Sequence, residues 1–139
     1  MARKAKAVVL DSWAVLAYLE GEASAENVAE IIADANEQEV PLLMTVINAG
    51  EVWYIIAREV SAADADASIK QLGELGIEFV DADWPLAKDA GHFKSKNKMS
   101  FADCFAAALA KQRNAQLVTG DLEFKQIEDE IAIYWLDRG

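Results

Sequence analysis

Four acidic residues stand far apart in this chain and together could form one metal-binding pocket. They are Asp11, Glu51, Asp103 and Asp121. Three of them fall where an apolar strand is expected to end or a helix to begin. Glu51 instead lies inside an apolar helical stretch, where an ionised group without a partner costs several kcal/mol. A metal ion would supply that partner, so these residue types point to metal-assisted chemistry.

Each acid also has a purely structural explanation. Asp11 and Asp121 follow apolar runs and precede helices, so either can cap a helix by accepting backbone N–H bonds. Asp103 follows Ser100 by three residues, a spacing that permits a variant of the capping box. Glu51 has no capping role. Its structural explanation would be an exposed position on the helix surface, but its apolar neighbours argue against exposure. The order of all four acids therefore carries more weight than any one of them.

The combination favours hydrolysis of a phosphoester with the help of divalent cations. Carboxylates a few ångströms apart cannot all ionise without compensation. Oxygen ligands suit Mg²⁺ or Mn²⁺, and the chain has no cluster of Cys and His for zinc. The one histidine, His92, has no recognisable catalytic partner, and no glycine-rich phosphate loop is present. One ion would activate a water molecule and a second would stabilise the leaving oxygen.

Short apolar strands alternate with helices along the chain. Strands are expected at residues 7–10, 41–45, 77–80, 116–119 and 132–136, and helices at 13–20, 24–37, 46–60, 61–76, from 84 to the lysine-rich residues, 100–113, and briefly after 121. The expected caps include Ser24, Thr45 and Ser100. This alternation predicts an α/β fold of three layers, α/β/α, with a mainly parallel sheet of about five strands. Right-handed crossovers place the carboxyl ends of the strands on one edge, where ligands bind.

Length and composition indicate one domain over residues 1–139, with 53% hydrophobic residues for its core. The single cysteine, Cys104, excludes an intrachain disulfide, which is typical of a reducing, cytoplasmic setting. Basic residues precede the first apolar run, but that run is too short for an export signal. No segment approaches the roughly 20 apolar residues of a membrane span. We therefore expect a soluble cytoplasmic protein without a membrane partner.

The net charge of −11 opposes long-range attraction to nucleic acid. A local basic cluster, however, leads to Asp103; it contains Lys88 and, closer to Asp103, the three lysines Lys94, Lys96 and Lys98. Such a run is by itself most often a solvated surface. The functional hypothesis is that the three lysines guide the phosphate backbone of a nucleic-acid substrate.

Four segments in this order resemble the PIN-domain ribonucleases, and in length and motif order the VapC toxins of type II toxin–antitoxin modules. The segments are VVLDS with Asp11, TVINAGEV with Asn48 and Glu51, SFADCFAAALA with Ser100 and Asp103, and LVTGDLEF with Thr119, Asp121 and Phe124. The resemblance covers nearly the whole chain. It implies a PIN-like fold and an endoribonuclease that depends on Mg²⁺ or Mn²⁺, is inhibited by a cognate antitoxin, and forms a homodimer.

The resemblance also implies roles for individual residues. Asp11, Glu51, Asp103 and Asp121 would form the catalytic pocket, in which Asp11, Asp103 and Asp121 would bind the metal. Ser12, Asn48, Ser100 and Thr119 would support them through hydrogen bonds. The acidity of the chain fits a basic antitoxin segment. Four aromatic residues on helix faces would form a groove on this chain for an antitoxin helix; they are Trp13, Tyr18, Trp53 and Tyr54. The alternative is that they are ordinary core residues.

Three other interpretations remain open at this point. One is a PIN-like binding module that does not cut RNA. A haloacid-dehalogenase-like phosphatase would need a second acid two residues after Asp11, where the chain has Trp13. A phosphorelay receiver domain would need an acidic pair where the chain has Asp11 and Ser12, together with an acid after the third strand such as Asp81 or Asp83. Trp13 also departs from the small or polar residue usual in PIN domains, so it either narrows the pocket or packs in the core.

Overall fold

A computed structural model describes residues 6–139, and the basic residues at the very start of the chain, in positions 1–5, lie outside them. The strands are β1 (Val8–Leu10), β2 (Leu42–Thr45), β3 (Ile77–Val80), β4 (Gln116–Thr119) and β5 (Ala132–Trp135). The helices are α1 (Ser12–Leu19), α2 (Ala25–Glu37), α3 (Val46–Glu59), α4 (Ala62–Glu74), α5 (Trp84–Lys96), α6 (Phe101–Gln112) and the 3₁₀ helix η1 (Leu122–Ile127). The predicted order of elements is confirmed.

The five strands form one sheet in the order β3-β2-β1-β4-β5, and every neighbouring pair is parallel. The central strand β1 pairs with β2 on one side and β4 on the other. The prediction of a mainly parallel, five-stranded sheet is therefore confirmed. Because parallel strands end at a common edge, the segments that follow β1, β2 and β4 lie next to one another.

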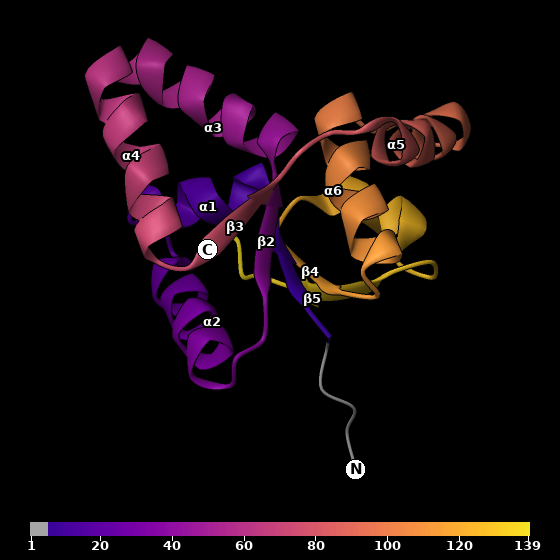
Figure 1. Ribbon diagram of the computed structural model, residues 1–139, viewed down its shortest axis with the longest axis horizontal. Helices are drawn as coiled ribbons and strands as arrows, with labels where there is room; N and C mark the ends of the chain where they lie inside the picture. The colour runs from indigo at the N-terminus through magenta and orange to yellow at the C-terminus, as the bar shows by residue number, and fades with distance from the viewer. Residues whose placement is uncertain (1–5) are drawn as a thin grey trace.

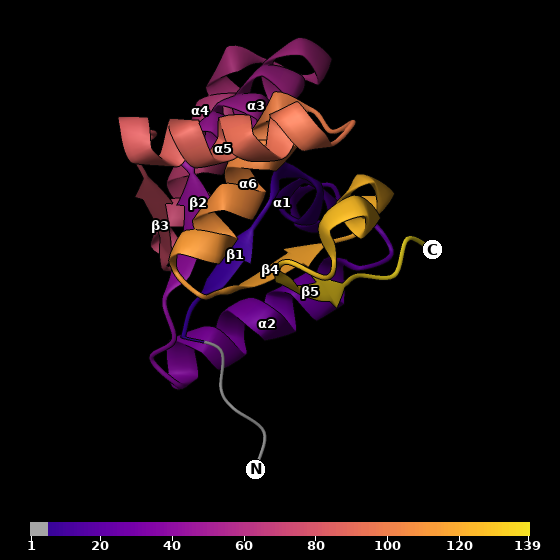
Figure 2. The ribbon, with the colours of Figure 1, turned by 90° about the vertical axis from the view of Figure 1, so that its right-hand side faces the viewer.

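Helices cover both faces of the sheet and complete three layers (Figures 1 and 2). Side chains alternate along each strand, so Val8 and Leu10 pack against α1 to α4, whereas Val9 packs against α5, α6 and η1. Phe124 of η1 is fully buried in this second cluster. Since both faces of the sheet are covered, its strands are almost continuously apolar.

Side-chain caps begin most of the helices at the predicted residues. Thr45 accepts the backbone N–H of Asn48 at 3.0 Å, and Ser100 accepts that of Asp103 at 3.1 Å. Ser24 stands at the N-cap position of α2, as predicted, but its side chain makes no capping bond and its buried Oγ has no hydrogen-bond partner among the described residues. Ser24 has φ −93° and ψ 6°, whereas the capping Thr45 is extended.

Charge is distributed unequally over the fold. Residues 12–80, from α1 to β3, carry thirteen acidic and two basic side chains. Residues 81–139, which include α5, α6 and η1, carry ten acidic and eight basic ones. The sequence's strong negative charge therefore belongs mainly to the α1–α4 part of the protein. Among the described residues, no helix is long and apolar enough to cross a membrane.

Candidate metal centre at the carboxyl edge of the sheet

Asp11 lies directly after the central strand and is buried, with 1% of its surface exposed. Its Oδ1 accepts the backbone N–H of Ala14 at 2.8 Å, so the residue does cap α1. Its Oδ2 accepts the hydroxyl of Thr119 at 2.5 Å, and the same hydroxyl oxygen accepts the N–H of Asp121 at 3.0 Å. The capping explanation therefore holds for Asp11, and its role in a catalytic site stays a prediction. Thr119 joins the ends of β1 and β4.

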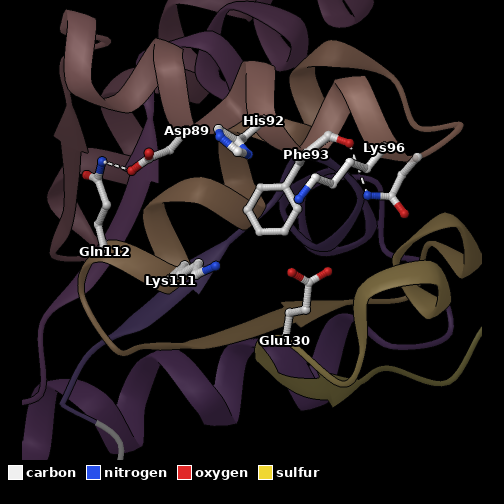
Figure 3. A pocket seen from close by; sticks show the side chains of 8 residues that line it. Asp89, His92, Phe93, Lys96, Lys111, Gln112 and Glu130 are labelled. Carbon is white, nitrogen blue, oxygen red and sulfur yellow. Dashed lines mark hydrogen bonds between the residues drawn. The ribbon is translucent and has the colours of Figure 1, made fainter.

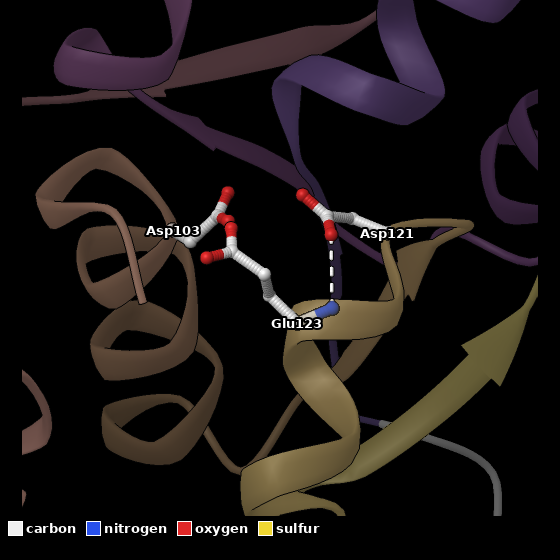
Figure 4. Close-up of side chains that lie close together, drawn as sticks. All are labelled: Asp103, Asp121 and Glu123. Carbon is white, nitrogen blue, oxygen red and sulfur yellow. Dashed lines mark hydrogen bonds between the residues drawn. The ribbon is translucent and has the colours of Figure 1, made fainter. Parts of the chain in front are cut away.

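Three carboxylates meet beside Asp11. One oxygen from each of Asp103, Asp121 and Glu123 lies within 4.8 Å of the other two. Asp103 comes from the first turn of α6, while Asp121 and Glu123 come from the start of η1 (Figure 4). The Oδ1 of Asp121 also accepts the N–H of Glu123 at 2.9 Å, which fixes the turn. Two acids of the predicted pocket are therefore in contact.

Glu123 belongs to this group although the sequence analysis did not select it. The available signal was its position two residues after Asp121, because a tight helical start can turn both carboxylates toward the same side. Asp11, by contrast, does not lie in the group of three found among residues 6–139.

Two of these acids, Asp103 and Asp11, resist ionisation in the protein alone. Burial, the hydrogen bond with Glu123 and the charges of Asp121 and Asp11 raise the pKa of Asp103 to about 9. Burial also raises the pKa of Asp11 to about 7, against the hydrogen bonds from Thr119 and Ala14 that favour its ionised form. Asp121 and Glu51 add to that increase. Ionisation of both carboxyls would therefore leave more negative charge in the site than its surroundings neutralise.

This donor set fits a divalent cation that prefers oxygen. Asp103, Asp121 and Glu123 offer carboxylate oxygens without sulfur or imidazole, which is the chemistry of Mg²⁺ and Mn²⁺ sites. A cation would also offset the like-charge repulsion that adds to burial in raising the pKa values of Asp103 and Asp11. The residues that are present are thus suited to the metal that the sequence analysis expected.

Glu51 lies on α3 and approaches Asp11 closely enough for its charge to raise the pKa of that carboxyl. It is half-buried and keeps part of its surface in water. The cost of burial that drew attention to Glu51 in the sequence is therefore smaller than its apolar neighbours indicate. Glu51 flanks the group of three acids and is not part of it.

Asn48 is buried completely and joins three helices. Its Oδ1 accepts the Thr45 hydroxyl at 2.6 Å, and its Nδ2 donates to the carbonyl of Ala102 at 3.0 Å. Ser12 donates its hydroxyl to the carbonyl of Asn48 at 3.2 Å. Asn48 and Ser12 therefore hold α1, α3 and α6 together directly behind the acids, and do not belong to the acidic group itself.

The three lysines do not form one patch. The Nζ of Lys94 donates to the carbonyl of Met99 at 2.6 Å, next to the Ser100 cap. Lys96 lines a separate cavity farther along α5. Lys98 lies on the following loop, where its backbone N–H donates to the side chain of Gln126. The three lysines are evenly spaced in the sequence but lie in different surroundings, because α5 ends at Lys96.

The acid Asp83 that a receiver domain would require has another role. It caps α5 by accepting the N–H of Leu86 at 3.0 Å. It follows β3, an edge strand that β2 separates from β1. Asp83 is therefore well placed as a helix cap, which removes support from the receiver-domain interpretation.

Trp13 packs in the core beside the turn that carries Asp121. A Cβ atom added to Gly120 would meet three carbons of the indole ring, with Cζ2 at 2.7 Å. Only glycine leaves room for this contact between the ring and the backbone. The ring therefore supports the turn between Thr119 and Asp121, and the core-packing alternative for Trp13 is the one observed.

Replacing Gly120 with alanine is expected to lower the free energy of unfolding by about 1–3 kcal/mol, because the new methyl group overpacks the site. It should also weaken metal binding, since either the ring or the Asp121 turn must move. Denaturant unfolding and Mn²⁺ titration would measure the two effects. Gly91→Ala on α5 is the matched control, because nothing lies within 4 Å of its added Cβ. Equal stability of the two variants would contradict the packing argument.

Comparison with known proteins identifies a family and a set of similar folds. The model of the PIN domain family matches residues 8–130. No curated protein sequence matches the chain. Among solved structures, a chain from the crystal structure of VapBC2 from Rickettsia felis bound to a DNA fragment from their promoter is similar with a TM-score of 0.73 and 18% identity. That match covers 94% of this chain and 98% of the other.

Two further structures have the same fold. Mycobacterium tuberculosis VapC20, described as a sarcin-ricin loop cleaving toxin, matches with a TM-score of 0.69 and 17% identity over 86% of this chain and 94% of its own. A chain of FitAcB from Neisseria gonorrhoeae matches with a TM-score of 0.67 and 19% identity over 91% of this chain and 96% of its own. At these identities the likeness establishes the fold.

Proposed function

The chain belongs to the PIN domain family, and on that premise we propose that it is a metal-dependent endoribonuclease that acts as the toxin of a toxin–antitoxin pair. The observation that carries the proposal is the group of three carboxylates at the carboxyl edge of the sheet, with buried Asp11 beside it. A bound divalent cation would offset charge on the scissile phosphate and lower the pKa of an attacking water molecule.

Within this proposal the protein's own residues have distinct tasks. Asp103, Asp121 and Glu123 hold the cation, with Asp11 as a further ligand or as the carboxylate that orients Thr119 and the Asp121 turn. Glu51 adds negative charge at the rim. Ser12, Asn48 and Ser100 fix the helices that carry the acids. Mg²⁺ and Mn²⁺ are the cations that suit these ligands.

The descriptions of the similar structures support RNA as the substrate and an antitoxin as the partner. VapC20 is a toxin that cleaves the sarcin-ricin loop, and VapBC2 was solved as a complex bound to promoter DNA. For the antitoxin, α3 and α4 carry five acidic and two basic side chains, and Trp53 and Tyr54 of α3 are exposed. A basic, amphipathic antitoxin helix would complement both the charge and the aromatic side chains.

The test is direct cleavage of RNA. The purified full chain is incubated with structured and single-stranded RNA in the presence of Mn²⁺ or Mg²⁺, and a parallel sample contains a chelator in excess of the metal. We expect cleavage with metal, its loss with the chelator, and its return when metal is restored. Cleavage that persists with the chelator would refute the metal mechanism. Binding of RNA without cleavage under any of these conditions would favour the alternative, a PIN-like binding module. The homodimer, the cytoplasmic setting and the single domain over residues 1–139 stay predictions.

A further inference from the structure

A cavity of about 410 Å³ opens away from the acidic group, between the C-terminal halves of α5 and α6 and the turn that precedes β5. The residues that line it are Asp89, His92, Phe93, Lys96, Lys111 and Glu130, together with the side-chain amides of Asn97 and Gln112. Figure 3 shows Lys96 and Lys111 on either side of the Phe93 ring, and the carboxylate of Glu130 below them. Nothing in the proposed mechanism uses this cavity.

The cavity contains two ammonium groups, those of Lys96 and Lys111, that could contact an anion. The Nζ of Lys111 lies 5.6 Å from the centre of the buried Phe93 ring, a cation–π contact that limits where the ammonium can go. Asp89 is already engaged, because its Oδ2 accepts the side-chain amide of Gln112 at 2.7 Å. Asp89 keeps its charge but is held by this bond, so the groups that can rearrange around a ligand are two ammonium groups and the exposed carboxylate of Glu130.

The position of the cavity relates it to the acidic group. Asp103 is in the first turn of α6 and Lys111 in its last, so the helix rise separates them by roughly 12 Å along the axis. A single-stranded nucleic acid commonly covers a binding domain such as the OB fold with about 4–16 of its nucleotides, a length that is enough to span that separation. Lys94 and Lys98 belong to the same part of the protein, residues 81–139, which holds eight of the basic residues. The opposite side, α1 to β3, is strongly acidic and would repel RNA.

We propose that this cavity binds a backbone phosphate of single-stranded RNA a few nucleotides away from the bond that is cut. Lys96 and Lys111 contact the phosphate, and it displaces the carboxylate of Glu130, which lies on an exposed turn and is free to move into solvent. The proposal rests on the proposed ribonuclease function. It replaces the linear Lys94, Lys96 and Lys98 cluster with a site assembled from two helices and a turn. Contacts of this kind position RNA without reading its sequence.

Removing positive charge from the cavity should weaken RNA binding, and removing negative charge from it should strengthen RNA binding. The binding protein is the full chain with Asp103→Asn to prevent cleavage, and the probe is a labelled single-stranded RNA of about 16 nucleotides. Lys96→Gln with Lys111→Gln should raise Kd about tenfold at low salt and reduce the slope of log Kd against log salt by about 0.7, the value for one lost phosphate contact. Glu130→Gln should lower Kd about threefold, since the competing carboxylate is gone.

Matched controls remove the same charges outside the cavity. Lys70→Gln with Lys88→Gln, on α4 and early α5, should leave the salt slope unchanged, and Glu128→Gln on the same turn as Glu130 should leave Kd unchanged. All of these side chains are exposed, so circular dichroism and melting temperature are expected to match those of the parent protein. If the cavity pair behaves like its control while the wild type still binds and cuts RNA, this site is refuted and the proposed function stands. If the wild type does neither, the proposed function fails, and this site with it.

Discussion

Asp103→Asn is expected to reduce metal-dependent RNA cleavage by more than about a hundredfold. Loss of a residue that only supports a metal ligand typically costs 10–100-fold, and Asp103 itself is one of the three acids whose oxygens converge. Asparagine keeps the size of the side chain and the backbone N–H that Ser100 accepts, so the start of α6 is preserved. The measurement is the initial rate of RNA cleavage at saturating Mn²⁺.

The same substitution should make the metal-free protein more stable. Asp103 is buried beside Asp121, Glu123 and Asp11, and its ionisation is opposed by burial and by their charge. Asparagine has no carboxyl that must stay protonated in the folded protein while it ionises in the unfolded one, so at neutral pH the melting temperature in chelator should rise while activity falls. Asp129→Asn, which removes an exposed charge after η1, is the control and should change neither quantity. Cleavage within tenfold of wild type would exclude Asp103 as a metal ligand.

The second large effect concerns pH. Without metal, the protein should lose stability as the pH rises from about 4 to about 9. The pKa of Asp11 is about 7 in the folded protein, against 3.8 ordinarily, and that of Asp103 is about 9. Between the unfolded and folded values the native state holds more protons than the unfolded state. The free energy of unfolding then falls with rising pH, for fully buried Asp11 by about 1.4 kcal/mol per pH unit.

Divalent metal should reverse this trend. The cation binds ionised carboxylates, so its binding releases protons and strengthens as the pH rises. The increase in melting temperature on adding Mn²⁺ should therefore be small at the acidic end of the window and large at its alkaline end. Thermal unfolding across the window, with Mn²⁺ and with chelator, tests both parts. Asp11→Asn should flatten the decline below about pH 7 and leave the part due to Asp103. A metal-free protein whose stability is constant or rises over the window would contradict the assignment.

The sequence predicted the scaffold of the site well because local signals agree with one another there. Short apolar runs predict β3 and β4 with the same first and last residues that the structure has. Thr45 and Ser100 act as the caps their positions indicate. Parallel pairing then placed Asp11 and Asp121 at one edge, because side-chain alternation and crossover handedness leave few other arrangements.

Predictions that depended on neighbours distant in the chain were less complete. Glu123 was missed because its importance comes from the approach of α6, which carries Asp103. Glu51 was expected to be surrounded by apolar groups, but its side chain reaches water at the rim. The three lysines look continuous in the sequence, yet the end of α5 separates them, and the partner of Lys96 in the cavity is Lys111 on α6.

By itself the sequence determined the order of strands and helices, the edge at which acids gather, and the family. Periodicity, caps and turn residues act over a few positions, so a single chain displays them. Tertiary structure alone decided which carboxylates touch, how Thr119 joins Asp11 to the Asp121 turn, and that the Trp13 ring requires glycine at position 120. Those contacts depend on packing distances of a few ångströms between segments up to 108 residues apart, which no local pattern records.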